Sequence, residues 1–348
     1  MTDERNQAAA AGFADDLGEK FDAGVRSGLL RDLHATIVCR GDSVVLERYF
    51  DGPDDAWGRP LGIVSFGPDT LHDLRSVTKS VVSLLYGIAL DRGLVPPLDA
   101  PLMAQFPEYG DLAADPARAG ITVGHALTMT LGMEWDEERP YTDPENSEIA
   151  MEMAPDRYRF VLERPVIVSP GTRWIYSGGA VALVGALIAR GAGKSLPDFA
   201  RDTLFAPLGI GNFEWAAGRD GIASPASGLR LTARDLLRIG RMVLAKGVHE
   251  GRRIVPAAWI EASLTSEIGT GDGLDYGRLW FLGRAEVPAF SGPRPWAAGF
   301  GNGGQRLYLC PDADVAAVIF AGQYDRPTAW VGPARIWGEI VLANLRHV

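Results

Sequence analysis

The sequence of 348 residues has few cysteines, few lysines and no long apolar run. Its two cysteines, Cys39 and Cys310, lie in separate apolar segments, where an unpaired thiol usually behaves as a small buried hydrophobic group. The longest apolar stretches, such as residues 180–189, are shorter than the roughly 18 residues that a membrane span needs, and no charged and then apolar leader opens the sequence. We therefore expect a cytoplasmic protein that has no membrane partner.

Acidic residues outnumber basic residues by 44 to 34, which gives a formal net charge of −10. Binding of nucleic acid needs clustered cations, and the sequence contains no such cluster, so no nucleic-acid partner is expected. The histidines do not have metal-ligand spacing and there is no cysteine cluster, so we expect neither a metal nor another cofactor. The sequence gives no indication of the oligomeric state.

The periodicity of apolar residues predicts strands at both ends of the sequence and helices between them. This pattern predicts an α/β (α+β) fold, with an antiparallel sheet flanked by N- and C-terminal helices and an inserted, mostly helical domain. The expected sheet domain is discontinuous and comprises residues 1–75 and 260–348, and the expected helical domain comprises residues 76–259. Strands are expected in a hairpin at 34–50 and at 278–283, 305–310 and 315–320, and helices at 76–91, 122–130, 179–190, 232–246 and after Pro333.

Ser76-Val77-Thr78-Lys79 places a serine and one of four lysines one turn apart at the start of a very apolar helix, which is normally buried. A buried amine loses hydration, and a decrease of about 3 units from its usual pKa of ~10.4 would make Lys79 a base near neutral pH. The Ser76 hydroxyl is within reach of this amine, so the two residues form the nucleophile and base that acyl transfer requires. The alternative is a lysine that extends from the helix end to solvent while Ser76 caps the helix.

Two later segments contain residues that could complete such a site. Tyr176 stands at the start of a predicted helix, where it could relay protons to a leaving group, although it could equally be an ordinary half-buried tyrosine. Residues 299–304 match the G-x-G-x-x-G pattern, but a strand follows them instead of the helix that a dinucleotide site needs. These glycines would instead allow a ligand to approach the backbone, or simply begin a strand. The sequence has no G-x-S-x-G, so a Ser-His-Asp triad of the α/β-hydrolase kind is not expected.

In chain order, Ser76-x-x-Lys79, Tyr176-Ser177-Gly178 and Asn302-Gly303-Gly304-Gln305 resemble the motifs of the serine β-lactamase and penicillin-recognising superfamily. Within it, the sequence is most similar to class C β-lactamase-like esterases and 6-aminohexanoate-dimer hydrolases. The resemblance implies a β-lactamase-like fold with the active site in the cleft between the sheet domain and the helical domain.

The resemblance also implies a role for each motif. Ser76 would be the acylated nucleophile, Lys79 its general base and Tyr176 the proton shuttle. The backbone N–H groups of Ser76 and Gln305 would form the oxyanion hole. The expected substrate-binding residues are Tyr141, on a loop that closes over amide substrates in the family, and Asn302, Gly303 and Gly304.

Two departures from the family pattern affect the expected substrate. β-Lactamases of this kind carry Tyr-x-Asn and Lys-Thr-Gly, whereas this sequence has Gly178 in place of the amide and Asn302 in place of the cation. We therefore expect a cofactor-independent serine hydrolase of a small ester or linear amide. A β-lactamase or D-amino-acid peptidase is the first alternative, and an inactive penicillin-binding-like sensor is the second. The acidic segment 136–145 could attract a substrate amine or be a solvated loop.

Overall fold

The computed structural model describes residues 2–346 of the protein, which divide into two compact units. The first unit contains the residues up to Val77, residues Arg230–Ala245 and those from Leu282 onward. The second unit contains Thr78–Leu229 and Lys246–Phe281. Residues 230–245 therefore belong to the first unit and residues 260–281 to the second, which differs from the boundaries expected from the sequence.

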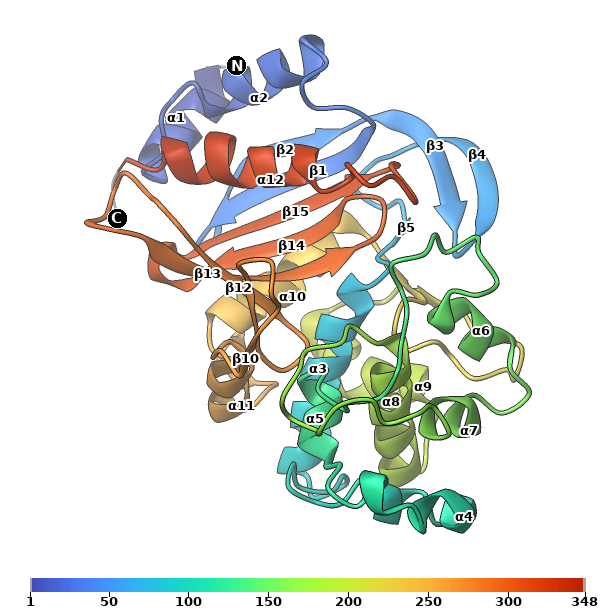
Figure 1. The fold of residues 1–348 in the computed structure, drawn as a ribbon. Helices are drawn as coiled ribbons and strands as arrows, with labels where there is room; N and C mark the ends of the chain where they lie inside the picture. Colours follow the sequence, from blue (N-terminus) through green and yellow to red (C-terminus); the bar gives the residue numbers. More distant parts are fainter. Residues whose placement is uncertain (1, 347–348) are drawn as a thin grey trace. The chain divides into compact units, whose positions relative to one another are not determined.

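The first unit is built on a sheet in which its strands follow the order β12-β13-β14-β15-β1-β2 (Figure 1). β1 comes from the N-terminal part of the chain and β15 from the C-terminal part, and they pair antiparallel with Val38 opposite Ala317. The expected hairpin is present as β1 and β2, and the expected sheet built from both ends of the chain is confirmed. The strands of this unit are β1 (Leu33–Arg40), β2 (Ser43–Tyr49), β3 (Asp51–Ala56), β4 (Arg59–Ser65), β5 (His72–Asp73), β12 (Phe281–Ala285), β13 (Arg294–Gly301), β14 (Gln305–Cys310) and β15 (Val315–Ala321).

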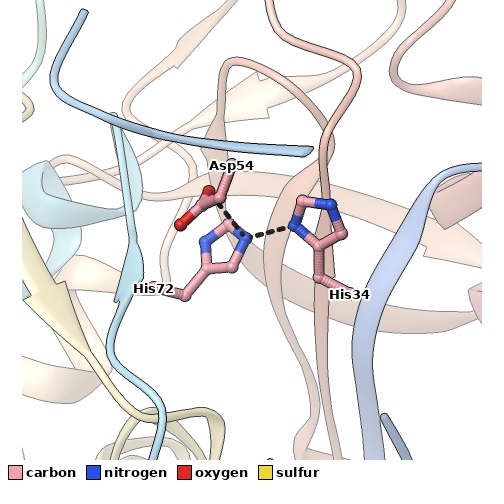
Figure 2. A group of neighbouring side chains, drawn as sticks. All are labelled: His34, Asp54 and His72. Atoms are coloured by element: carbon pink, nitrogen blue, oxygen red, sulfur yellow. Dashed lines mark hydrogen bonds and ion pairs between the residues drawn. The ribbon is translucent and has the colours of Figure 1, made fainter. Parts of the chain in front are cut away.

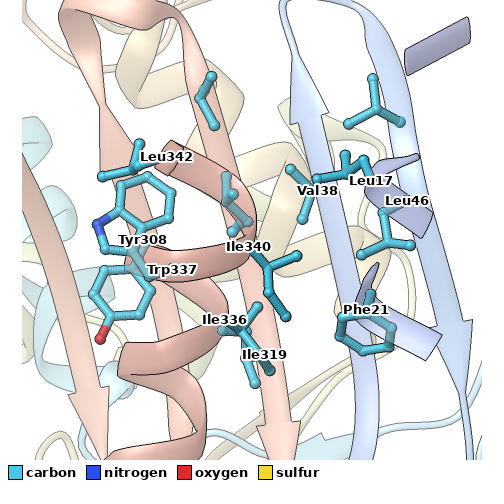
Figure 3. Packing of buried hydrophobic residues seen from close by; sticks show 14 of the residues in the cluster. Leu17, Phe21, Val38, Leu46, Tyr308, Ile319, Ile336, Trp337, Ile340 and Leu342 are labelled. Carbon is cyan, nitrogen blue, oxygen red and sulfur yellow. The ribbon is translucent and has the colours of Figure 1, made fainter. Parts of the chain in front are cut away.

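Successive side chains of a strand point to opposite faces of the sheet, and apolar side chains lie on both faces here. Helices therefore cover both faces of this sheet. Tyr308 faces the C-terminal helix, where its ring stacks on Trp337 at a centroid distance of 4.9 Å and an angle of 4° (Figure 3). Its neighbour Leu307 faces the opposite side, where a Cβ at Gly240 of α10 would lie 2.8 Å from it. This close approach explains why α10 belongs to the first unit. The helices of this unit are α1 (Thr2–Ala10), α2 (Leu17–Arg26), α10 (Ala233–Leu244) and α12 (Val331–Arg335), which continues as a π-helix over Ile336–Val341.

The second unit is mostly helical, as expected, and polar caps define its helix ends. Ser177 caps α8 by accepting a hydrogen bond from the Ala180 backbone N–H, and Gly193 ends the helix in a left-handed conformation. α3 carries the chain from the first unit into the second. The elements are α3 (Val77–Asp91), α4 (Gly110–Ala113), α5 (Val123–Leu127), α6 (Ser147–Met153), α7 (Arg157–Leu162), α8 (Gly178–Ala192), α9 (Leu196–Ala200), α11 (Ala257–Ser263), β6 (Glu214–Trp215), β8 (Val248–His249), β9 (Arg252–Arg253), β10 (Ile268–Gly269) and β11 (Asp275–Tyr276). The short strand β7 (Leu229–Leu231) begins in this unit and continues into the first.

Two predicted elements end or begin at other residues than expected, and left-handed backbone is the reason in both cases. The helix predicted over 122–130 ends at Leu127, and Met129 then has a φ of +60°. The strand predicted over 278–283 begins only at Phe281, because Leu279 has a φ of +62°. Such angles are unfavourable for side chains with a Cβ, so neither sequence pattern revealed them.

α8 is apolar along most of its length, and residues 178–188 of it are buried. Among the described residues, no single helix is long and apolar enough to cross a membrane. Within residues 2–346, one pair of helices, residues 178–192 and 196–208, has the required length and composition together, but it is bent by 71°.

Candidate functional site

Ser76 directly precedes α3, in a segment of the first unit that ion pairs hold in place. Arg75, just before it, has a left-handed φ of +47°, which costs a residue with a side chain about 1 kcal/mol. The Arg75 guanidinium pairs with Asp55 and with Asp73, 3.3 Å away, and lies 4.7 Å from the centre of the Tyr324 ring. Ser76 itself is 7% exposed. These contacts fix the turn that leads into the candidate nucleophile.

A buried group of side chains, His34, Asp54 and His72, lies just upstream of this turn (Figure 2). Nδ1 of His72 is 2.9 Å from the Asp73 carbonyl, to which it donates, so Nε2 of His72 is left to accept a hydrogen bond from Nδ1 of His34 at 2.8 Å. The pKa of His72 lies well below its usual value because the ring is fully buried and faces His34. These residue types could ligate a metal, but the two ring nitrogens are separated by a hydrogen-bond distance, and a neutral hydrogen-bonded pair accounts for the geometry.

In the second unit, Lys79 is the centre of a cluster of titratable side chains. Lys79 is 2% exposed, and its Nζ donates to the Ala226 carbonyl at 3.0 Å and lies 3.5 Å from Oε2 of Glu148. The centre of the Tyr176 ring is 4.8 Å from Nζ. Thus Lys79 and Tyr176, two of the residues singled out in the sequence, lie together.

The charge state of Lys79 differs from the one expected. Burial lowers the pKa of the amine, but the nearby Glu148, Tyr176 and Glu137 raise it more, so that the net shift is upward from the usual value. The expectation of a decreased pKa was therefore wrong for the protein without substrate. The physical reason is that carboxylates close to a buried amine favour its charged form by more than burial disfavours it.

Both carboxylates are held by hydrogen bonds, and sequence reasoning gave neither a role at Lys79. Glu148, in the first turn of α6, is 2% exposed and accepts a hydrogen bond from Oγ of Ser227 at 2.6 Å. Glu137 accepts hydrogen bonds from Nε1 of Trp135 at 2.6 Å and from the backbone N–H of Gly178. Burial, and then the like charge of Glu148, raise the pKa of Glu137 to about 7.

Gly178 explains how these carboxylates fit beside Lys79. A Cβ at this position would lie 2.6 Å from Oε2 of Glu148 and 3.1 Å from Oε1 of Glu137. The space that a side chain at position 178 would need is therefore occupied by carboxylate oxygen. The sequence contained one signal of this, namely glycine at the third position of the Tyr-Ser-Gly motif.

Tyr141 lies in the same cluster. Its hydroxyl donates to Oε2 of Glu137 at 3.0 Å, and burial followed by Glu137 raises its pKa well above the usual value, so the phenol remains neutral. The rest of the acidic loop is partly neutralised by Arg139, which pairs with Asp136 at 3.0 Å and with Glu145 at 2.8 Å.

The glycine-rich segment lies in the first unit and leads into β14, a strand, as the sequence indicated. A Cβ at Gly301 would lie 2.5 Å from the Leu74 carbonyl, so this segment passes very close to the turn before Ser76. Gln305 is buried, and its side chain bridges to Ala321 of β15, donating at 2.7 Å and accepting at 3.0 Å. The Asn302 amide exchanges two hydrogen bonds with Asp325, at 2.8 and 2.9 Å.

The predicted site residues are thus distributed over both units. Lys79, Tyr141 and Tyr176 come together in the second unit. The others belong to the first unit, and they are Ser76, Asn302, Gly303, Gly304 and Gln305.

Comparisons with known proteins agree with the motifs. The model of the β-lactamase family matches residues 28–335. A 6-aminohexanoate-dimer hydrolase of Paenarthrobacter ureafaciens is 26% identical over 321 residues, which cover 86% of this chain and 75% of the relative. Esterase EstB of Burkholderia gladioli is 30% identical over 208 residues, which cover 58% and 51% of the two chains.

Solved structures show the same fold. EstCE1, described as a hydrolase with promiscuous acyltransferase activity, superposes with a TM-score of 0.70 at 16% identity and covers 96% of this chain and 99% of its own. An octameric penicillin-binding protein homologue from Pyrococcus abyssi has a TM-score of 0.67 at 18% identity, with coverage of 92% and 76%.

Proposed function

The chain belongs to the β-lactamase family, and on this basis we propose that this serine hydrolase cleaves a carboxylic ester or a linear amide through an acyl-enzyme on Ser76. The observation that carries the proposal is the buried Lys79 amine, which lies beside Tyr176 and follows Ser76 by three residues on the same chain segment. Relatives named as a 6-aminohexanoate-dimer hydrolase and an esterase support both substrate classes.

In the proposed reaction, Oγ of Ser76 attacks the carbonyl carbon while its proton passes to Nζ of Lys79. The backbone N–H groups of Ser76 and Gln305 stabilise the oxyanion, each contributing about 3 kcal/mol to lowering the barrier. The Tyr176 hydroxyl then passes a proton to the leaving alcohol or amine as the carbonyl re-forms. Water next attacks the acyl-enzyme, loses a proton through the same groups, and returns Ser76 to its hydroxyl form.

The raised pKa of Lys79 has a consequence for this sequence of steps. An ammonium cannot accept the Ser76 proton, so the amine must first lose one proton. We therefore expect the rate of acylation to rise with pH until the Lys79 amine is neutral. Tyr141 and the segment Asn302–Gly304 complete the proposal as substrate-binding groups.

Labelling with a fluorophosphonate tests the nucleophile. Intact-mass measurement should show one covalent adduct, which Ser76→Ala removes. Ser80→Ala is the matched control, because Ser80 is a buried serine on the same helix and binds the Leu279 carbonyl at 2.8 Å. Wild-type protein that forms no adduct on Ser76 would support the inactive sensor instead.

A substrate panel separates the hydrolase alternatives. Short p-nitrophenyl esters and linear amides should be cleaved much faster than nitrocefin, since Asn302 supplies no cation for the lactam carboxylate. Comparable rates on nitrocefin and esters would favour the β-lactamase alternative. A cytoplasmic location remains a prediction, which cell fractionation can check.

A further inference from the structure

Position 178 lacks the side chain that the family motif carries there. β-Lactamase-like Tyr-x-Asn motifs carry an amide three residues into the segment, and here that residue is Gly178. The missing Cβ at position 178 would lie 2.6 Å from Oε2 of Glu148. We infer that the Glu148 carboxylate replaces this amide beside Lys79 and that it is a positioning residue, fixing the place and the charge of the Lys79 amine.

The hydrogen bonds of Glu148 explain how it can hold the amine. Asn146 caps α6 by accepting from the backbone N–H of Glu148 at 3.0 Å, which fixes the residue at the helix start. Ser227 donates to Oε1 at 2.6 Å, which leaves Oε2 facing Nζ of Lys79 at 3.5 Å. The Ala226 carbonyl, next to Ser227, accepts from the same Nζ at 3.0 Å. One chain segment, residues 226–227, therefore orients both members of the pair.

The titratable groups around this pair come from three parts of the second unit. Glu137 and Tyr141, on the loop before α6, and Tyr176, before α8, face Lys79 and Glu148. Burial, and with it the negative charge of Glu148, also raises the pKa of Glu152, one turn further along α6. Because a buried ammonium is stable only beside counter-charge, removal of Glu148 should make the neutral amine accessible at lower pH.

This inference rests on the proposed function, since its first test uses Ser76 labelling. In Glu148→Gln, the amide oxygen can still accept from Ser227 while the negative charge is lost. The pH dependence of the fluorophosphonate labelling rate should then move, with its acid limb at least about one unit lower than in the wild type. Glu138→Gln is the control, because Glu138 is an exposed residue on the loop before α6. This variant should leave the acid limb of the labelling rate in place.

A purely structural role for Glu148 predicts a different result. It would lower the labelling rate equally at every pH, and an unmoved acid limb in folded Glu148→Gln would overturn the inference. Thermal unfolding of the variant, monitored by circular dichroism, confirms that the measurement is made on folded protein.

A reciprocal exchange tests the replacement itself. Gly178→Asn alone forces Glu148 away from Lys79, so the labelling rate should fall at least about tenfold. In the double variant Gly178→Asn/Glu148→Ala the new amide has room, and the rate should exceed that of Gly178→Asn about tenfold or more. If the double variant is labelled no faster than Gly178→Asn, the side chains at positions 148 and 178 do not compete for the same space.

The two proposals can fail separately. If the wild type is not labelled on Ser76, the proposed function fails. The melting temperatures of Gly178→Asn, Glu148→Ala and the double variant then still test the replacement, because Gly178→Asn should cost less stability when Glu148 is already alanine. Additive stability losses would overturn it.

Discussion

Each unit of the protein buries a group of titratable side chains, and the two groups have opposite charge behaviour. In the first unit, burial and a second imidazole keep His72 neutral, with Arg75 and Arg230 acting in the same direction. In the second unit, burial also opposes the charge of Lys79, yet the neighbouring acidic groups, Glu148 first among them, keep it an ammonium. The comparison shows that burial alone does not decide the charge of a buried base, because the sign of the neighbouring charges decides it.

The largest effect on activity is expected when Lys79, the cation of the buried cluster in the second unit, is removed. Lys79→Ala should lower kcat/KM for an ester by about 10³-fold or more, because nucleophile and base act as a unit, and Ser76→Ala should cost about as much. Lys194→Ala is the control, since this exposed lysine pairs with the equally exposed Asp202 at 2.6 Å. Retention of more than about a tenth of the activity in Lys79→Ala would contradict the general-base role.

Tyr141 belongs to the same buried cluster through its hydrogen bond to Glu137. We expect this residue to distinguish amidase from esterase activity. An amide needs a proton at a poor nitrogen leaving group, whereas an activated ester does not. Tyr141→Phe should lower the kcat of any amidase activity about tenfold, a difference of ~1.4 kcal/mol, while sparing p-nitrophenyl esters. Tyr49→Phe, which removes a similar bond to Glu47 of 2.5 Å, should affect neither. Equal losses on both substrate classes would remove Tyr141 from the mechanism.

The neutral histidine pair predicts that acid destabilises the protein. Burial lowers the pKa of His34 as well as that of His72, so the unfolded chain binds protons that the folded protein does not. The free energy of unfolding should therefore fall as pH drops below about 6.5, by about 1.4 kcal/mol per pH unit for each proton. In His34→Gln this dependence should be weaker, as measured by urea unfolding between pH 5 and 8. An unchanged slope would mean that the pair is not the source of the acid sensitivity.

Glu137 should give a smaller dependence of opposite sign. Its pKa of about 7 in the folded protein means that the folded state keeps a proton which the unfolded chain has already lost. Its contribution to stability therefore decreases as pH rises from about 4.5 to about 7. Glu137→Gln should reduce this decrease in melting-temperature measurements, and the exposed Glu138→Gln should not. Burial also raises the pKa of Glu152 to about 7, so Glu152 contributes to the same decrease in stability. Part of the decrease should therefore remain in Glu137→Gln.

Much of the fold was predictable because its signals are local. The alternating apolar residues of β1, β2, β14 and β15 and the capped helices α8 and α10 follow from neighbouring residues in the sequence. The early end of α5 and the late start of β12 were not predictable, because Met129 and Leu279 adopt left-handed angles that only their packing imposes.

For the candidate site, the sequence by itself determined which reactive groups are present: a serine and a lysine one helical turn apart, a tyrosine before a capped helix, and glycines leading into a strand. It also determined that position 178 has no side chain. The tertiary structure decided the charge of Lys79, because Glu137 and Glu148 lie far from it along the chain and reach it only when α6 and its preceding loop fold beside α3 and α8. Electrostatic energy depends on distance in space and on burial, and sequence spacing specifies neither for residues so far apart.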